Sequence, residues 1–505
     1  MLNSYGNTKE PDILEVISDL SNDEVFTPPS VAKQMLDLLP ADVWGNPSLR
    51  WIDPFTKTGV FLREITKRLL AGLDKEIPDE RQRLDHILRN MVFGVAITEL
   101  TSLMSRRSLY CSKWANSDTS VVKLSTKQGN LLYQRVEHEF FRGRCSECFA
   151  GEFQHGGGPE TENYAYALLH QEGRRWMEKE IGLNFDIVVG NPPYQMDSDG
   201  SNRTLPLYNL FVNQAMALGP KHVLMIIPSR WMAGGLGLSE FRDQMLQDRR
   251  IRQLVDFPNA KEVFPGVEIK GGVSYFHWQA DHSGTCSSTV VRGDEVVGPY
   301  ERDLSEFDVF VRDQRALSIL RKVLAKENPS ITKILSVDKE FGWTSNFRDF
   351  AKSEAPDSVP IFYNEKGSRL QGWIARKEVT KSTSLIDTWK VMVPKAGSDG
   401  GQKLPDIVLG TPFVASSPSV CTQTYLFFAL NSELEARNVE KFVKTRFFRF
   451  LVSLRKISQD ATRATYTWVP LLDFKKTWTD KELASEFELD PHEIELIASF
   501  VKEMD

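Results

Sequence analysis

Residues 186–194 read Asp-Ile-Val-Val-Gly-Asn-Pro-Pro-Tyr, a short apolar run that ends in a turn. The run predicts a buried strand, and the two prolines predict a stiff turn with fixed φ angles. Asn191 and Pro192 present a side-chain amide oxygen and a backbone carbonyl, which are two acceptors in preset positions. Tyr194 adds an aromatic face. An ordinary strand-terminating turn is the alternative interpretation.

Two fixed acceptors beside an aromatic ring suit one kind of chemistry. An exocyclic amine on a nucleobase is a poor nucleophile, because its lone pair is delocalised into the ring. Acceptors on Asn191 and Pro192 would each take one N–H of such an amine and leave the lone pair free for attack. The Tyr194 ring would stack on the base. Such a site needs neither a nucleophilic side chain nor a catalytic metal.

Strand and helix patterns alternate on both sides of this stretch. Short β-rich runs occur at 49–53, 92–97, 186–190, 222–228, 251–257 and 272–278, and helical patterns follow the first two. Strands separated by helices predict an α/β fold with a mostly parallel sheet. Ligands bind such sheets at the carboxyl ends of the strands, where Asp53 and Asn191 both fall. We therefore expect these two residues to share one site.

Composition sets outer limits on the function. The chain has 505 residues and a net charge of −6, so a polyanion would have to meet a local basic patch. The apolar run 223–227 is far shorter than a membrane span, and residues 1–6 lack the pattern of a signal peptide. The five cysteines fit thiols or metal ligands better than a disulfide framework. These features predict a cytoplasmic protein without a membrane partner.

The regular alternation fades after about residue 300. Turn-rich stretches such as 394–401 appear in its place. A domain boundary is therefore expected near 295–330, and we divide the chain into domains at 1–300 and 301–505.

One segment has the composition of a nucleic-acid contact. Residues 441–456 carry six basic side chains and no acidic one, interleaved with phenylalanines. Apolar positions recur at helical spacing, so one face would pack inward while the cations face a phosphate backbone. A solvated helix face is the alternative. The candidate contacts are Lys441, Lys444, Arg446, Arg449, Arg455 and Lys456.

The cysteine spacing suggests a metal site. Cys145 and Cys148 are separated by two residues, His138 precedes them, and Cys111 lies upstream. These four would make a tetrahedral zinc site, with His155 as an alternative ligand, although free thiols are the other interpretation. The site would clamp an insertion over about residues 133–182, in a structural role.

The order of the motifs resembles a known family. Thr-Pro-Pro at 27–29 precedes a helical pattern, Asp-Pro-Phe-Thr-Lys-Thr-Gly-Val-Phe occupies 53–61, Asn-Pro-Pro-Tyr occupies 191–194, and a long C-terminal region follows. This order resembles the γ-class, TaqI-like adenine-N6 DNA methyltransferases of restriction-modification systems, over roughly residues 20–280. The resemblance implies a Rossmann-like methyltransferase domain and a C-terminal α+β target-recognition domain. It also implies S-adenosylmethionine as cofactor and double-stranded DNA as partner.

The resemblance assigns most of the cofactor site. Thr27 would bond the amino-acid end of S-adenosylmethionine. Asp53, Pro54 and the turn through Gly59 would surround its methionine moiety. Phe211 matches the position whose ring packs on the cofactor adenine.

Two positions depart from the family pattern, and one further aromatic matches it. Ala96 stands where the family has an acid that binds the ribose, which leaves Glu99 as the nearest replacement. Asn130 stands where an aspartate usually receives the adenine amine, and an amide oxygen still accepts that hydrogen bond. Phe276 matches the ring that would face Tyr194 across an adenine drawn out of the duplex.

Three functions are open on the sequence. The first is site-specific adenine-N6 methylation of double-stranded DNA, in a restriction-modification or phage-defence system. The second is methylation of RNA or of a protein amide, whose enzymes usually lack so large a C-terminal region. The third is a DNA-binding specificity subunit with weak catalysis, suggested by Ala96 and Asn130. No nuclease-like Asp…Glu-x-Lys cluster stands out, so a restriction nuclease is expected to be a separate protein.

Overall fold

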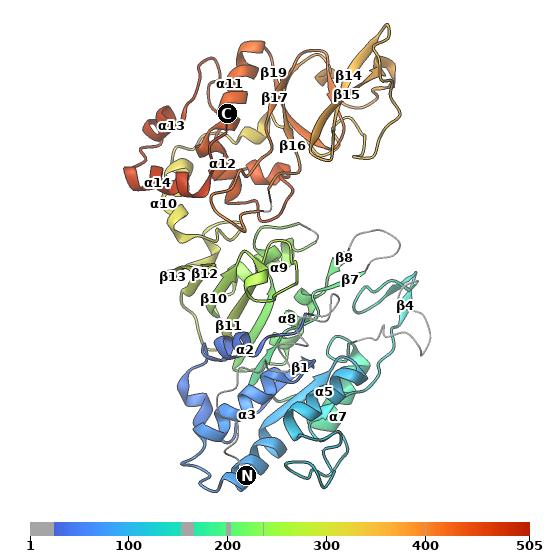
Figure 1. Cartoon of the computed structure of the whole chain (residues 1–505), viewed down its shortest axis with the longest axis vertical. Coiled ribbons are helices and arrows are strands. Elements are labelled where there is room, and N and C mark those ends of the chain that lie inside the picture. Colours follow the sequence, from blue (N-terminus) through green and yellow to red (C-terminus); the bar gives the residue numbers. More distant parts are fainter. Residues whose placement is uncertain (1–24, 153–165, 198–203, 236, 399, 505) are drawn as a thin grey trace. The chain divides into compact units, whose positions relative to one another are not determined.

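The structure is a computed structural model, and it describes residues 25–152, 166–197, 204–235, 237–398 and 400–504 (Figure 1). The chain divides into two compact units. The first comprises residues 1–231 and 235–308, and the second comprises 232–234 and 309–505. No helix in the described ranges combines the length and apolar character that a membrane crossing requires.

Within the described ranges, the first unit is built on a nine-stranded sheet of order β13-β12-β10-β11-β9-β6-β1-β2-β3. Five neighbouring strands run parallel. These are β3 (Leu131–Leu132), β2 (Val92–Ala96), β1 (Trp51–Thr56), β6 (Ile187–Gly190) and β9 (His222–Pro228). All are wholly buried and mostly apolar, as strands covered on both faces require.

The remaining strands extend the sheet with mixed directions. β11 (Val273–Gln279) runs antiparallel between β9 and β10 (Ile251–Phe257). β12 (Cys286–Arg292) pairs parallel with β10, and β13 (Glu295–Arg302) pairs antiparallel with β12. The predicted α/β class with a mostly parallel sheet is confirmed, and all six predicted strands are present.

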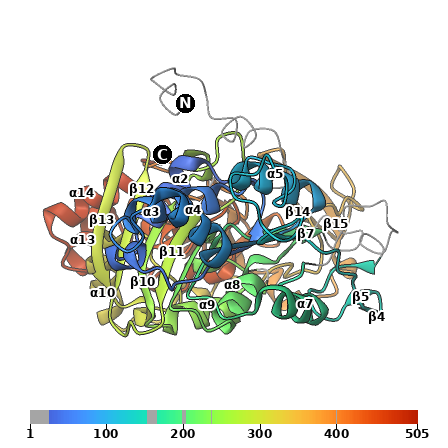
Figure 2. The same cartoon turned by 90° about the horizontal axis from the view of Figure 1, so that it is seen from below.

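Helices cover both faces of this sheet. Figure 2 shows α2 (Pro29–Leu36), α3 (Val60–Gly72) and α5 (Glu99–Tyr110) on one face, with α8 (Tyr208–Ala217) and α9 (Ser239–Gln247) on the other. The unit also contains α4 (Glu80–His86) and α7 (Gln171–Ile181). The core on the first face joins residues of α2 and α3 to alternate strand positions.

The order of the strands places a ligand site. β1 lies between β2 and β6, where the strand order reverses, and a crevice forms at such a switch point outside the carboxyl ends of the strands. Asp53 lies in β1, and Asn191 directly follows β6. The two predicted motifs are therefore neighbours at the carboxyl edge.

Two hairpins interrupt the alternation of strands and helices. One consists of β4 (Phe140–Phe141) and β5 (Arg144–Cys145), in the chain between β3 and α7. The other consists of β7 (Gln195–Asp197) and β8 (Thr204–Pro206), directly after Tyr194.

The second unit combines small sheets with helices. One sheet contains β14 (Ser358–Glu365), β15 (Ser368–Ala375) and β18 (Val420–Cys421), and another contains β16 (Trp389–Pro394), β17 (Phe413–Ala415) and β19 (Tyr425–Leu430). The two sheets share one apolar core. The helices are α10 (Leu317–Ala325), α11 (Glu433–Lys444), α12 (Arg446–Ser453), α13 (Asp480–Glu486) and α14 (Pro491–Phe500).

Candidate active site

Two glycines allow the carboxyl edge to close around Asp53. A Cβ atom on Gly190 would lie 2.4 Å from the Phe55 ring and 2.8 Å from Asp53 Oδ1, so the last residue of β6 must lack a side chain. Gly59 caps α3 with a φ of 77°, and a Cβ there would lie 3.0 Å from the backbone of Ser105. The pocket at this edge is lined by Thr27, Asn191 and seven residues of the segment 53–61.

The orientation of the Asn191 amide is fixed by the N-terminal segment. Asn191 is 4% exposed, and its Nδ2 donates hydrogen bonds to the Val25 carbonyl (2.9 Å) and to Thr27 Oγ1 (3.1 Å). Its Oδ1 is buried and has no hydrogen-bond partner among the described residues. A buried acceptor without a donor is costly, and it marks a place where a ligand can supply one.

Lys57 is a functional candidate that the sequence analysis missed. Its side chain lines the same pocket, and its Nζ donates to the Val25 carbonyl at 2.9 Å. One carbonyl therefore receives both the Lys57 ammonium and the Asn191 amide. The signal for Lys57 in the sequence was its position between Asp53 and Gly59, inside the motif at 53–61.

Asp53 is a buried acid with an altered titration. Burial raises its pKa to about 7, although the Phe55 amide, Thr56 and the Lys57 charge all favour ionisation. The Phe55 amide donates to Asp53 Oδ1 at 3.2 Å. A cationic ligand in this pocket would restore the charged form. The pocket is narrow, with a volume of about 10 Å³, so a ligand enters only if the lining segments shift.

The two aromatic candidates, Tyr194 and Phe276, pack in different surroundings. Tyr194 packs on the apolar core shared with α2 and α3, and burial raises its pKa well above the usual range. Phe276 is fully buried in the middle of β11, between Met225 and Leu254 of the neighbouring strands. Its neighbour Tyr275 belongs to the core on which Tyr194 packs. Phe276 therefore faces the side of the sheet opposite to that core, because alternate strand residues face opposite sides, and its assignment as the second wall stays a prediction.

The cofactor candidates divide into those at the edge and one that lies elsewhere. Pro54 follows Asp53 in β1, and Glu99 is exposed at the start of α5, just beyond the carboxyl end of β2. Asn130 precedes β3, and its Nδ2 donates to the carbonyls of Leu88 and Arg89 at 2.9 Å each. Those carbonyls precede β2 at the opposite edge, so the assignment of Asn130 to the cofactor is wrong.

Phe211 belongs to an aromatic chain beside the pocket. It is fully buried, and its ring meets the ring of Phe55 at 5.3 Å and that of Tyr166 at 5.3 Å, both in edge contacts. Phe55 hydrogen-bonds Asp53, so Phe211 is one residue removed from the predicted site. Tyr166 comes from the insertion, which therefore contacts the ring behind Phe55, a residue of the pocket wall.

A cluster of metal-ligating side chains lies in the insertion. His138, Cys145, Cys148 and His170 place their ligand atoms within 4.8 Å of one another and could hold a metal ion. Cys145 Sγ lies 3.4 Å from His170 Nε2, and Cys148 Sγ lies 3.4 Å from His138 Nδ1. Burial raises the pKa of the Cys148 thiol to about 12, and a bound cation would reverse that shift.

The ligand set differs from the predicted one. Cys111 is exposed at the end of α5 and lies outside the cluster, so its assignment as a ligand is wrong. His170 takes the fourth place, and its Nδ1 lies 2.9 Å from the Tyr166 carbonyl, as the second nitrogen of a metal ligand commonly does. His155 lies outside the described residues. A histidine directly before a helix, far along the chain from the cysteines, gave little local signal.

The predicted basic helix at 441–456 is wrong as a continuous cationic surface. Thr445 ends α11 and caps α12, so the segment forms two helices. Arg449, Arg455 and Lys456 are 0%, 6% and 3% exposed. Arg449 donates to the carbonyls of Thr445, Ile407 and Lys444, and Arg455 and Lys456 donate to those of Ala464 and Ser398. These three cations donate to backbone carbonyls and have little or no exposure to solvent.

The other three cations of that segment remain at the surface. Lys441 is exposed, while Lys444 lies 3.6 Å from Glu440 and Arg446 lies 3.4 Å from Glu503. Two of the three are therefore partly neutralised.

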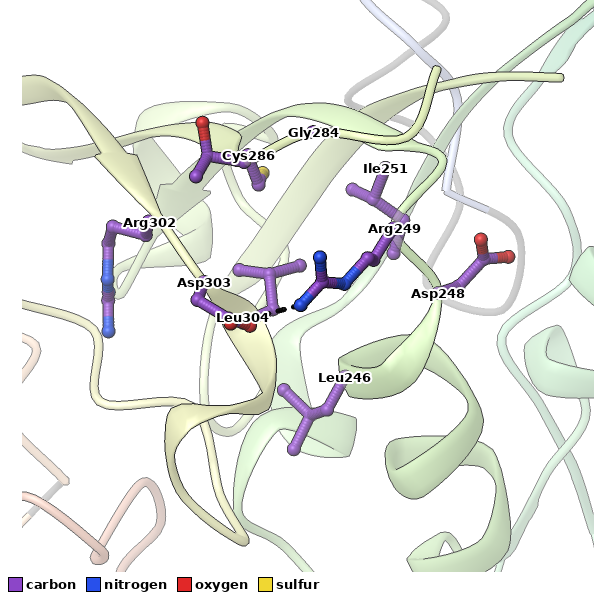
Figure 3. Close-up of a pocket in the computed structure, with 10 residues that line it drawn as sticks. Leu246, Asp248, Arg249, Ile251, Gly284, Cys286, Arg302, Asp303 and Leu304 are labelled. Carbon is purple, nitrogen blue, oxygen red and sulfur yellow. Dashed lines mark ion pairs between the residues drawn. The ribbon is translucent and has the colours of Figure 1, made fainter. Parts of the chain in front are cut away.

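A separate pocket lies away from the carboxyl edge. Figure 3 shows Arg249 pointing toward Asp303 beside Ile251 and Cys286. The charged groups of Arg249 and Asp303 lie 3.6 Å apart, and the cavity has a volume of about 190 Å³. Because Ile251 and Cys286 begin β10 and β12, this pocket is at the opposite end of those parallel strands from the catalytic motifs.

The sequence is similar to a known methylase family and to one of its relatives. The family model "Eco57I restriction-modification methylase" matches residues 90–264. An "uncharacterized adenine-specific methylase" of Mycoplasma pneumoniae is 38% identical over 300 residues, which cover 54% of this chain and 71% of that protein.

Several solved structures are also similar. The Type IIL restriction-modification enzyme MmeI in complex with DNA is 12% identical, with a TM-score of 0.49, over 94% of this chain and 75% of that chain. A type I restriction-modification chain is 13% identical, with a TM-score of 0.35, over 62% of this chain and 54% of that one. A modification subunit from Vibrio vulnificus YJ016 is 14% identical, with a TM-score of 0.34, over 58% and 51%. The chain thus spans about half the length of the last two structures.

The Mycoplasma relative is matched over more than two thirds of its length, and the family model covers the strand and turn that carry Asn191. The chain therefore belongs to the Eco57I family of adenine-specific DNA methylases of restriction-modification type.

Proposed function

We propose that the chain is a γ-class methylase that methylates N6 of an adenine turned out of double-stranded DNA. The observation that carries this proposal is the fixed Asn191 amide, whose Nδ2 is held by Val25 and Thr27 while its Oδ1 lacks a donor. An adenine amine supplies that donor. A carboxylate has no hydrogen to donate and a hydroxyl has only one, whereas an amine can donate to Asn191 Oδ1 and to the Pro192 carbonyl together, so the pair of acceptors favours an amine substrate.

The residues present fit S-adenosylmethionine, the methyl donor that membership of this family implies. Asp53 offers a buried carboxylate to a cationic group, and Thr27 offers a hydroxyl. Gly59 removes the side chain that would block approach to the turn after β1. Glu99 lies at the end of β2, where a ribose would be held, and Phe211 is set behind Phe55. When bound, this cofactor supplies an electrophilic methyl group on a sulfonium.

The chain's own residues would prepare the amine. Asn191 Oδ1 and the Pro192 carbonyl each accept one N–H, which frees the nitrogen lone pair from the purine ring. The two prolines keep these acceptors in place. Tyr194 stacks on the base, and its raised pKa keeps the ring neutral. Orientation and electrostatics then account for the rate, because no covalent enzyme intermediate forms.

The cluster of His138, Cys145, Cys148 and His170 is proposed as a structural zinc site. Two thiolates and two imidazoles are a common tetrahedral zinc set, and the close approach of all four ligand atoms suits one small ion. Within the insertion, the metal would join the β4–β5 hairpin to the start of α7 through His170.

The two parts of the chain would have different functions. We assign residues 1–300 to methyl transfer and residues 301–505 to target recognition, because the catalytic motifs all lie in the first part. Double-stranded DNA is the partner, and a restriction nuclease would be a separate protein in the same defence system. The enzyme would act on DNA in the cytoplasm.

The test is methyl transfer from labelled cofactor into duplex DNA, followed by digestion and analysis of the modified nucleosides. We expect N6-methyladenine with the wild-type protein and none with Asn191→Ala. Asn90→Ala, at an exposed position on the same unit, is the control. Transfer to RNA or protein in place of DNA would refute the substrate, and full activity of Asn191→Ala would refute the role of the amide.

A further inference from the structure

The β4–β5 hairpin carries an aromatic and basic surface in the insertion. Phe141 and Phe149 are 69% and 55% exposed, and Arg142 and Arg144 are exposed beside them. The Arg142 guanidinium lies over the Phe141 ring, 5.2 Å from its centroid. We refer to these four residues as the hairpin surface. Large aromatics that stay in water on a short hairpin are costly unless they meet a partner.

The hairpin surface is held in one conformation. Phe141 pairs with Arg144 across a two-residue turn, in which Arg142 and Gly143 both have positive φ angles of 52° and 79°. Cys145, which directly follows, belongs to the metal cluster, and its amide donates to the Ala150 carbonyl at 2.8 Å. The cluster therefore anchors the base of the hairpin, and the tip is presented with little conformational entropy to lose on binding.

The charge of the hairpin surface is positive. Residues 140–146 contain two arginines and no acid. Two of the four nearby acids are engaged elsewhere: Glu137 lies 2.6 Å from Arg135, and Glu147 accepts from the Gln171 amide at 2.8 Å. Glu139 and Glu152 flank the hairpin and are exposed. In the described part of the chain, neither tip arginine forms an ion pair, so both remain available to an anion.

The topology places this surface on the catalytic side of the sheet. The chain leaves the carboxyl end of β3 before the hairpin and returns through α7 to the start of β6, so the insertion lies at the edge that carries Asn191. The contact between Tyr166 and Phe211 supports this placement. In Figure 1, β4 and the β7–β8 hairpin lie on the same side of the first unit.

We propose that the hairpin surface is a second contact to double-stranded DNA, beside the target adenine. Arg142 and Arg144 bind backbone phosphates, and Phe141 packs against a sugar or base exposed in the groove. This inference rests on the proposed function in one respect, namely that the substrate is duplex DNA. It also supplies the cationic contact that the buried segment 441–456 does not.

The experiment measures binding of the full chain to a fluorescent DNA duplex of mixed sequence by anisotropy, over a range of salt concentrations. The double variant Arg142→Asn/Arg144→Gln keeps a residue that tolerates positive φ at the turn. We expect at least a tenfold loss of affinity at low salt. The slope of log affinity against log salt should fall by about 1.8, because two phosphate contacts are lost. Phe141→Ala should weaken binding several-fold with the slope unchanged.

The matched control is Lys75→Gln/Arg81→Gln, which removes two exposed charges beyond the end of α3, at the opposite edge. It should leave the slope within experimental error. Zinc content is measured in each variant, so that a broken hairpin is recognised by loss of metal. Wild-type affinity and slope in a metal-retaining arginine variant would overturn the proposal. Wild-type protein that binds duplex but transfers no methyl group would overturn the proposed function instead, and the variant comparison would still decide the hairpin contact.

Discussion

Thr27 and Asn191 are 164 residues apart in the chain, yet Asn191 Nδ2 donates a 3.1 Å hydrogen bond to Thr27 Oγ1 in the interior. The bond requires the amide nitrogen to point at the N-terminal segment and leaves Oδ1 as the acceptor for a substrate. Thr27 thus determines which atom of the Asn191 amide is left to accept a hydrogen bond.

Replacing Thr27 with valine removes that acceptor while keeping a similar volume. The amide then loses one of its two restraints, so we expect the turnover rate to fall by roughly tenfold, on the scale of one hydrogen bond of about 1.4 kcal/mol. Single-turnover methyl transfer measures this effect. Thr27→Ser keeps the oxygen and should retain most of the activity, and equal rates for both variants would contradict the role of the bond.

Replacing Gly190 with alanine forces a methyl group into the Phe55 ring and the Asp53 carboxylate. We expect a loss of about 2–4 kcal/mol in the free energy of unfolding, from overpacking next to a buried acid. Chemical denaturation measures it. Gly235→Ala is the control, because a Cβ there meets nothing within 4 Å, and similar losses in both variants would argue against steric crowding at β6.

Asp53 predicts a pH dependence of cofactor binding. Its pKa is raised to about 7 by burial, so the carboxylate becomes charged as pH rises through that value. Affinity for a cationic cofactor should therefore increase from pH 6 to pH 8, and calorimetric titration of S-adenosylmethionine measures it. Asp53→Asn should bind more weakly and show a flat profile, whereas a wild-type profile that is also flat would contradict the assignment.

The same acid predicts an opposite effect on stability. A raised pKa in the folded state means that Asp53 stabilises the fold fully below its unfolded pKa, and that this contribution is lost as pH rises through about 7. Asp53→Asn should therefore unfold with a higher free energy at pH 8, by roughly 2–4 kcal/mol. Denaturation at pH 5 and pH 8 checks the sign, with the exposed Asp74→Asn as control.

The metal cluster predicts a difference between two cysteines. Cys148→Ser and His170→Asn should lose a stoichiometric zinc ion, and a chelator should lower the melting temperature of the wild-type protein. Cys111→Ser should keep its zinc, because that residue lies outside the cluster. Elemental analysis measures the zinc content of each variant. Wild-type protein that contains no zinc while its thiols are reduced would contradict the proposed metal site.

Arg449 predicts a stability effect without a DNA effect. Its buried guanidinium donates to three carbonyls, so Arg449→Met removes three hydrogen bonds at once and should cost about 3 kcal/mol. Thermal unfolding measures the loss. The salt dependence of DNA binding should stay unchanged, and a shallower slope would place this cation on the DNA surface after all.

The sequence was sufficient for features that depend on local pattern. The strands at 222–228 and 251–257 have their predicted bounds, because continuous apolar runs between turn residues have few other conformations. The meeting of Asp53 and Asn191 followed from a rule of parallel sheets. Both inferences needed only residue type, spacing and chain direction.

Features that depend on distant neighbours were beyond the sequence. Alternation along β11 predicts that Tyr275 and Phe276 face opposite sides, but which of these sides packs on the core beneath Tyr194 depends on distant residues and is not readable from the strand alone. The spacing of Arg449 predicts a surface cation, whereas its burial depends on carbonyls such as that of Ile407, which lie far away in the sequence. His170 belongs to the cluster because the chain of the insertion returns to the cysteines before α7. Asn130 donates to a carbonyl that precedes another strand, β2.

The shared carbonyl of Val25 carries a consequence for control of the enzyme. Because one peptide oxygen accepts from both the Lys57 ammonium and the Asn191 amide, a displacement of Val25 removes one hydrogen bond from each group at the same time. A change in the backbone at Val25 therefore reaches the amide and the lysine together, without any direct contact to the crevice.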